Sequence, residues 1–183
     1  MPTTWCSFST PLGALEFSAE VLGVSSYAPA TRLSVNSREL QPRLPDGMRV
    51  KESHCVLFRI ETEEPSEIEL TVRLDCNESV VAGAETGEGL EAQVWRSSRH
   101  VLAVGTEDAE FLLSRTGQSD PKSSASYKYK RSSLSIRLTT LGARRPFTFH
   151  FVAAWGPCPE TTSESCWYAV DQLHSYVIDH LAA

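Results

Sequence analysis

The sequence has no apolar run long enough to cross a membrane. Its longest apolar runs are short, such as residues 151–155 with the sequence FVAAW, whereas a transmembrane helix needs about 20 residues. The first residues, MPTTWCSF, carry neither the basic start nor the apolar stretch of a secretory signal peptide. We therefore expect a cytoplasmic protein without a membrane partner.

The sequence also lacks the cysteine spacing of a disulfide-stapled fold. Its five cysteines are an odd number and lie far apart, at positions 6, 55, 76, 158 and 166. A reducing compartment keeps such cysteines as thiols, and a free cysteine behaves mainly as a small buried apolar residue. We therefore expect all of them to be reduced and structural.

Short catalytic and ligand-binding motifs are absent as well. The sequence contains no Cys-x-x-Cys or His-x3-His pair, no Gly-x-Ser-x-Gly or His-Glu-x-x-His segment, and no glycine-rich phosphate loop. Metal sites and catalytic centres usually show one of these patterns. The sequence therefore predicts no catalytic residue, no metal ligand and no cofactor. It favours a protein that is not an enzyme, without deciding the question. We expect His174 to pair with Asp171 or to line the edge of the core.

The residues that are present indicate one β-rich domain spanning residues 1–183. With 183 residues, of which 41% are hydrophobic and 22% charged, the chain can bury a core of its own. Apolar and polar residues alternate over residues 15–21, 68–74, 134–138 and 147–151, which is typical of strands with one buried face. Such strands belong to antiparallel sheets. We expect an α+β fold with a mostly antiparallel sheet of about 6–8 strands, forming a sandwich or a single curved sheet.

The order of strands and turns predicts three hairpins and two loops. The hairpins would join residues 54–62 to 67–75, residues 133–141 to 146–155, and residues 94–96 to 101–104. The loops lie near residues 36–50 and 116–133, which are rich in proline, glycine and serine. We expect these loops to be mobile.

Two segments are predicted to be helical. Residues 107–115 read as a short helix that Thr106 caps and Gly117 ends, although the same residues could form a strand. Residues 161–164, with the sequence TTSE, match a capping box at the start of a helix over about residues 162–181. Apolar residues at positions 166, 170, 173, 177 and 181 then recur at helical spacing. This C-terminal helix is amphipathic and should pack on the sheet.

Negative charge is concentrated in one part of the chain. Residues 61–91 hold ten acids and one base, a net charge of −9, whereas the whole chain carries −6. Carboxylates on one face of a strand can speed and orient the docking of a basic protein partner. The candidate partner-binding residues are Glu61, Glu63, Glu64, Glu67, Glu69, Glu85 and Glu88.

A second candidate surface is basic and aromatic. It is the loop formed by Tyr127, Lys128, Tyr129, Lys130 and Arg131, whose cations and rings could contact phosphates. The pI of about 5.4 argues against a protein that binds duplex DNA.

Three classes of function remain open. A small acidic α+β domain without catalytic motifs is typical of non-catalytic interaction modules. Among these are stoichiometric inhibitors, such as the immunity proteins that neutralise bacterial toxins. In that case the partner would be a basic protein, such as a toxin or an enzyme that acts on nucleic acid.

The first alternative is a protein that binds a small molecule or carbohydrate in a β-rich pocket lined by Trp95, Trp155, Tyr127 and Tyr129. The second alternative is an enzyme without a recognisable short motif.

Overall fold

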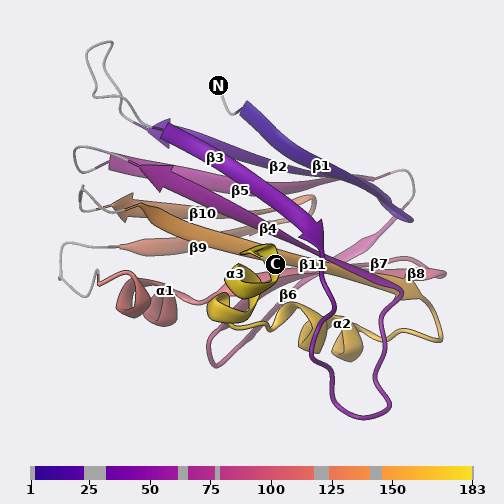
Figure 1. Ribbon diagram of the computed structural model, residues 1–183. Helices are drawn as coiled ribbons and strands as arrows, with labels where there is room; N and C mark the ends of the chain where they lie inside the picture. Colours follow the sequence, from indigo (N-terminus) through magenta and orange to yellow (C-terminus); the bar gives the residue numbers. More distant parts are fainter. Residues whose placement is uncertain are drawn as a thin grey trace.

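Two antiparallel sheets form the body of the protein (Figure 1). The computed structural model describes residues 3–22, 32–61, 66–76, 79–117, 124–140 and 146–182, and these ranges contain eleven strands and three helices. Sheet A consists of β1 (Thr3–Thr10), β2 (Gly13–Leu22), β5 (Ser66–Cys76), β10 (Ser133–Thr140) and β9 (Ala125–Lys130), in this spatial order. Sheet B consists of β3 (Arg32–Glu39), β4 (Glu52–Glu61), β11 (Phe147–Pro157), β8 (His100–Glu107), β7 (Leu90–Arg96) and β6 (Val81–Gly87). The predicted α+β fold is confirmed, as a sandwich with more strands than expected.

The main core lies between the two sheets. Sheet A alternates along β2, β5 and β10, so that Leu15, Leu70 and Ile136 point inward while the residues between them face outward. Sheet B contributes aromatic side chains to the same core, among them Phe151 and Trp155 from β11. Packing these two inner faces together buries large apolar side chains and supplies most of the driving force for folding.

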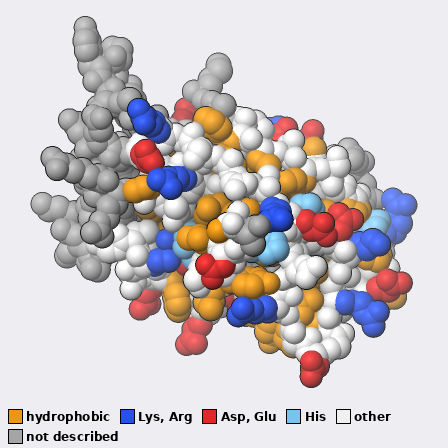
Figure 2. All heavy atoms as spheres, in the orientation of Figure 1, with side chains coloured by type: hydrophobic (Ala, Val, Ile, Leu, Met, Phe, Trp, Pro, Cys, Tyr) orange, Lys and Arg blue, Asp and Glu red, His pale blue; other side chains and the backbone are white. Residues whose placement is uncertain are grey.

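A second core lies between sheet B and two C-terminal helices, α2 (Ser163–Val170) and α3 (His174–Ala182). Because both faces of β8 and of the second half of β11 are covered, residues 101–104 and 151–155 read as continuous apolar runs and not as alternating ones. Val152 and Ala154 of β11 face Cys166 and Val170 of α2 in this core. Figure 2 shows the helix-covered side, where hydrophobic side chains gather between dispersed acidic and basic ones.

Two of the three predicted hairpins are wrong. β4 lies in sheet B and β5 in sheet A, and β10 and β11 are likewise divided between the sheets. Alternation identifies a strand but carries no information about which sheet the strand joins. The prediction therefore pairs each strand with its neighbour in the sequence. The third predicted hairpin is confirmed, because β7 and β8 pair antiparallel with Val94 opposite Ala103.

The single C-terminal helix predicted over residues 162–181 is also wrong, because α2 ends at Val170 and α3 starts at His174. The side chain of Gln172 causes the break. Its amide donates to the carbonyls of Tyr168 and Arg43 and accepts the Arg43 N–H, so it satisfies the end of α2 and holds the 40–51 loop. None of the helices that the structure describes is both long and apolar enough to cross a bilayer.

The helix starts and loop boundaries differ in detail from the prediction. Helix α1 (Ala109–Arg115) is confirmed, but its N-cap is Asp108, which accepts the Phe111 N–H at 2.8 Å, while Thr106 is buried in β8. Thr162, not Thr161, caps α2. β3 continues to Glu39, which shortens the first predicted loop. β9 occupies residues 125–130 of the second predicted loop.

The contact between α2 and sheet B provides a stability test at Gly105 of β8. A Cβ atom at this position would lie 2.6 Å from Val170 Cγ2 and 3.0 Å from Leu90 Cδ1. We expect Gly105→Ala to lower the free energy of unfolding by about 1–3 kcal/mol through overpacking. We expect Val170→Ala in the same chain to recover part of that loss, which urea unfolding would measure. Gly83→Ala is the control, because a Cβ at Gly83 meets nothing within 4 Å. Equal losses at the two glycines would contradict the packing described.

Candidate functional site

The outer face of sheet A is polar and crosses three neighbouring strands. On β2 and β5, Glu16 lies opposite Arg73 and Glu20 lies opposite Glu69. On the other side of β5, Arg137 of β10 lies opposite Glu69. These residues alternate with the core residues of the same strands, so the pleat of the sheet fixes their direction. Here they are called the sheet A outer face, together with Glu67 of β5 and the hydroxyl residues between them.

A hollow of about 270 Å³ lies on the sheet A outer face. Its lining consists of Thr4, Glu16, Ser18, Glu20, Glu69, Thr71 and Arg73. Two carboxylates face each other across this hollow, because Glu20 and Glu69 are cross-strand partners. Like charges directly opposite each other destabilise a sheet. A positively charged group seated between them would offset that repulsion.

Ion pairs within the chain balance several of the other carboxylates. Glu16 lies 3.1 Å from Arg73, and Glu67 accepts from the Arg137 guanidinium. The Arg137 guanidinium also lowers the pKa of the Glu67 carboxyl. The charge of these glutamates is thus partly neutralised on the surface.

The structure brings together only some of the predicted acidic residues. Glu67 and Glu69 lie side by side on the sheet A outer face, whereas Glu61 is on β4 of sheet B, where it pairs with Arg59. Glu85 of β6 is held by Arg96 at 2.8 Å, and Glu88 is exposed in the turn between β6 and β7. Glu63 and Glu64 lie outside the described residues. Sequence reasoning missed Glu16 and Glu20, which come from a strand about fifty residues earlier and join the site only through sheet pairing.

The predicted basic and aromatic loop is wrong, because these residues form the edge strand β9 and the turn after it. Alternation along β9 separates the two residue types: Lys128 and Lys130 are exposed, while Tyr127 and Tyr129 pack against the main core. The Tyr127 hydroxyl donates to the Glu107 carbonyl at 2.6 Å, and the Tyr129 hydroxyl donates to the Glu91 carboxylate. Burial raises the pKa of both tyrosines. The tyrosine rings therefore pack against the core, while Arg131, in the turn, is exposed. A contact of this segment with phosphates stays a prediction.

The four aromatics of the predicted pocket do not assemble around a cavity. Trp95 and Trp155 are buried between the sheets, and the Trp95 indole N–H donates to the Arg131 carbonyl at 2.8 Å. A second hollow, of about 430 Å³, is lined by Val80, Val81, Ala82, Gly83, Ala84, Gln93, Tyr129, Lys130 and Arg131. Only Tyr129 of the four predicted aromatics reaches it.

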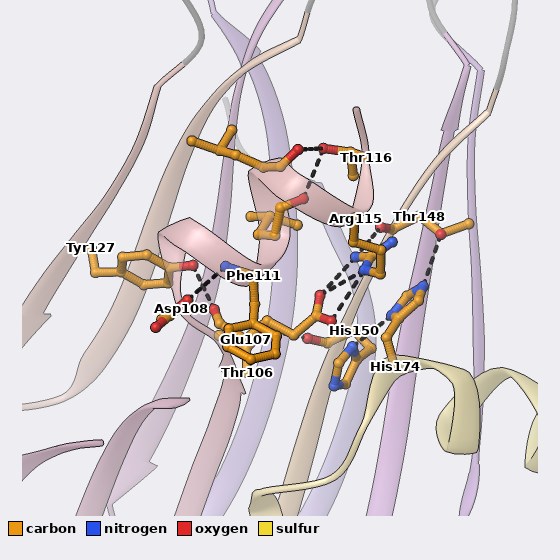
Figure 3. A network of polar contacts seen from close by, with 12 residues as sticks. Thr106, Glu107, Asp108, Phe111, Arg115, Thr116, Tyr127, Thr148, His150 and His174 are labelled. Carbon is orange, nitrogen blue, oxygen red and sulfur yellow. Dashed lines mark hydrogen bonds and ion pairs between the residues drawn. The ribbon is translucent and has the colours of Figure 1, made fainter. Parts of the chain in front are cut away.

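Sequence reasoning missed a partly buried polar cluster on the helix-covered face of sheet B (Figure 3). It is here called the histidine cluster and consists of Glu107, Arg115, Thr148, His150 and His174. The two histidine Nδ1 atoms lie 2.8 Å apart, and His174 Nε2 lies 3.0 Å from the Thr148 hydroxyl. Arg115, at the end of α1, donates to both Glu107 carboxylate oxygens and to the Thr148 carbonyl.

Burial sets the charge of the histidine cluster. Desolvation, with a smaller effect of the Arg115 charge, lowers the pKa of His174 to about 4 and that of His150 well below its usual range. Both imidazoles are therefore neutral at physiological pH, and the charges in the cluster are those of the Glu107–Arg115 pair. Of the two positions predicted for His174, the structure shows the one at the edge of the core. Its hydrogen-bond partners are Thr148 and His150 and not Asp171. No short motif signals this cluster, because its residues come from β8, α1, β11 and α3.

Comparisons with known proteins add little about this site. No protein-family model matches the chain, and no curated protein matches it. Among solved structures, the chain is similar to a putative kojibiose phosphorylase from human microbiome, with 11% sequence identity and a TM-score of 0.42. The match covers 92% of this chain but 20% of that one. A likeness at this level carries no argument about function.

Proposed function

We propose that the protein is a non-catalytic interaction module that binds a basic protein partner on the sheet A outer face. The observation that carries the proposal is the pair of opposed carboxylates, Glu20 and Glu69, in the hollow of about 270 Å³. A lysine or arginine side chain of the partner would donate charge-assisted hydrogen bonds to both carboxylates. The surrounding Ser18 and Thr71 hydroxyls supply further donors and acceptors.

The size of this face also suits a protein partner. Five strands spaced by about 4.8 Å and rising about 3.3 Å per residue give a surface of roughly 20 by 30 Å. That area, about 600 Å² before side-chain relief is added, approaches the roughly 800 Å² that each partner buries in a standard interface. Because the backbone is already ordered in a paired sheet, little backbone entropy is lost on binding.

The proposal includes the class of partner and the compartment. Carboxylates that occupy the phosphate sites of an enzyme acting on nucleic acid would inhibit it without any catalytic residue, as an immunity protein does with a toxin. The net charge of −6 would speed encounter with such a basic enzyme. We place the protein in the cytoplasm, where its five free cysteines would stay reduced. The pocket alternative has less support, because Trp95 and Trp155 are in the core.

The test is to capture the partner with the full chain from its native host and to measure association kinetics with the purified partner. We expect a basic protein whose association rate falls steeply as ionic strength rises from about 0.01 to 0.15 M, because the Debye length shrinks from about 30 to 8 Å. The dissociation rate should change far less. An acidic partner, a salt-independent association rate, or the absence of any stoichiometric partner would contradict the proposal.

A further inference from the structure

The histidine cluster contains the ligand types of a metal centre. One ligand atom from each of Glu107, His150 and His174 lies within 4.8 Å of the other two. Two imidazoles and one carboxylate form a known zinc ligand set, in which a fourth position is left for water or another group. We propose that Glu107, His150 and His174 bind one divalent transition-metal ion, with zinc the best fit, which fastens α3 to strands β8 and β11. This inference is independent of the proposed partner surface on sheet A.

The spacing of the two histidines fits a shared ion. Ligand nitrogens at about 2.0–2.1 Å from zinc lie about 2.9 Å apart at a right angle and about 3.3 Å apart at the tetrahedral angle. The Nδ1 atoms of His150 and His174 are 2.8 Å apart, so a small outward movement is enough. The Glu107 carboxylate, within 4.8 Å of both histidines, has to approach further.

Hydrogen bonding around the histidines also fits ligation. Without an ion, one Nδ1 must carry a proton and donate it to the other. With both Nδ1 lone pairs on an ion, each Nε2 carries the proton, and that of His174 donates to the Thr148 hydroxyl. Metal-bound histidines usually donate their second N–H in this way, which fixes the ring and its tautomer.

Electrostatics favours neutral ligands and limits the affinity. The histidines are 1% and 5% exposed, and burial in general favours the neutral imidazole, which is the form that binds a metal. Glu107 supplies the negative charge, and its side chain is 11% exposed, which leaves a path from solvent. Arg115 already donates to Glu107, but a carboxylate has about four lone-pair positions and can accept both. The positive charge of Arg115 opposes a dication and should weaken binding.

The test is calorimetric titration of Zn²⁺ into the full chain after treatment with a chelator, with Co²⁺ absorption as a second probe of coordination. We expect one ion per chain and a rise in Tm of about 5–10 °C when free zinc is a hundredfold above Kd. His174→Gln and Glu107→Gln should each weaken binding at least tenfold. Thr148→Val, which removes only the hydroxyl that positions His174, should weaken it about 10–100-fold with unchanged stoichiometry.

His180→Gln is the matched control, because His180 lies on α3 but bonds to the Glu39 carbonyl outside the cluster. Its zinc affinity should equal that of the original chain. Should His174→Gln fail to unfold cooperatively, the more conservative Glu107→Gln and Thr148→Val carry the test. Zinc binding that is absent, or that is as strong in Glu107→Gln and Thr148→Val as in the His180→Gln control, would overturn the proposal.

Discussion

A chain that ends at Glu160 should fail to fold. The truncation removes α2 and α3, and with them the fully buried side chains of Val170 and Val177. It also exposes the face of sheet B that these helices cover. The buried apolar side chains of that face include Leu90, Val94, Val101 and Val152. At about 1.5–3 kcal/mol per large buried side chain, the loss is about 9–18 kcal/mol, against a net stability of about 5–15 kcal/mol for a typical domain.

Circular dichroism during heating measures this outcome. We expect no cooperative transition in the truncated chain, and aggregation through the exposed face of sheet B. Two point variants of the full chain serve as controls. Leu173→Ala should change the free energy of unfolding by less than about 0.5 kcal/mol because Leu173 is 65% exposed, whereas Val177→Ala should lower it markedly. A cooperative melt of the chain ending at Glu160 would show that the helices are an appendage.

These expected effects show what periodicity in the sequence could and could not predict. Helical spacing placed Leu173 and Val177 on one stripe, as it would for a straight helix. The Gln172 side chain ends α2 and redirects the chain, so Leu173 turns to solvent while Val177 remains buried. Glutamine is an ordinary helix residue, and its effect here depends on Arg43 in a distant loop. That contact has no local signal in the sequence.

The strands show the same limit at the level of topology. Alternation in residues 68–74 and 134–138 correctly predicted two strands, β5 and β10, but not that they pair with each other in sheet A. The number of strands was underestimated because β1, β3, β6 and β9 were not predicted. They are the edge strands of the two sheets and bury few side chains, so their apolar pattern is weak. The assignment of β4 and β5 to opposite sheets depends on packing between the sheets. A single strand's pattern does not encode that choice.

Long-range assembly also explains which parts of the candidate sites were found. Glu67 and Glu69 were predicted because they share a strand and a face. Glu20 was missed because its position opposite Glu69 follows only from the pairing of β2 with β5. The histidine cluster was missed for the same reason, since residues 107, 150 and 174 are too far apart in sequence to form a motif. The composition of a segment shows how much charge it carries, whereas the pairing of strands determines which charged residues lie next to each other.

Neutralising the two opposed carboxylates should slow binding of the basic partner by at least about tenfold at low ionic strength. The double variant is Glu20→Gln with Glu69→Gln, which keeps the shape of both side chains and removes both charges from the hollow. Most of the loss of affinity should come from a lower association rate, because surface charges act chiefly on the encounter of two proteins. The free energy of unfolding should change by less than about 0.5 kcal/mol per site, as is usual for surface substitutions.

The matched control changes the same amount of charge on the helix side of the protein. Glu110→Gln in α1 with Asp179→Asn in α3 removes two exposed carboxylates far from the hollow. If net charge alone steers the partner, the two double variants should slow association equally, and the proposed docking face would be wrong. Glu67→Gln provides a further comparison within the sheet A outer face. Glu67 makes the direct hydrogen bond to Arg137 and does not line the hollow, whereas Glu69 does. The loss of Glu67 should therefore slow association less than the loss of Glu69, and stopped-flow rates across a salt series would separate the two.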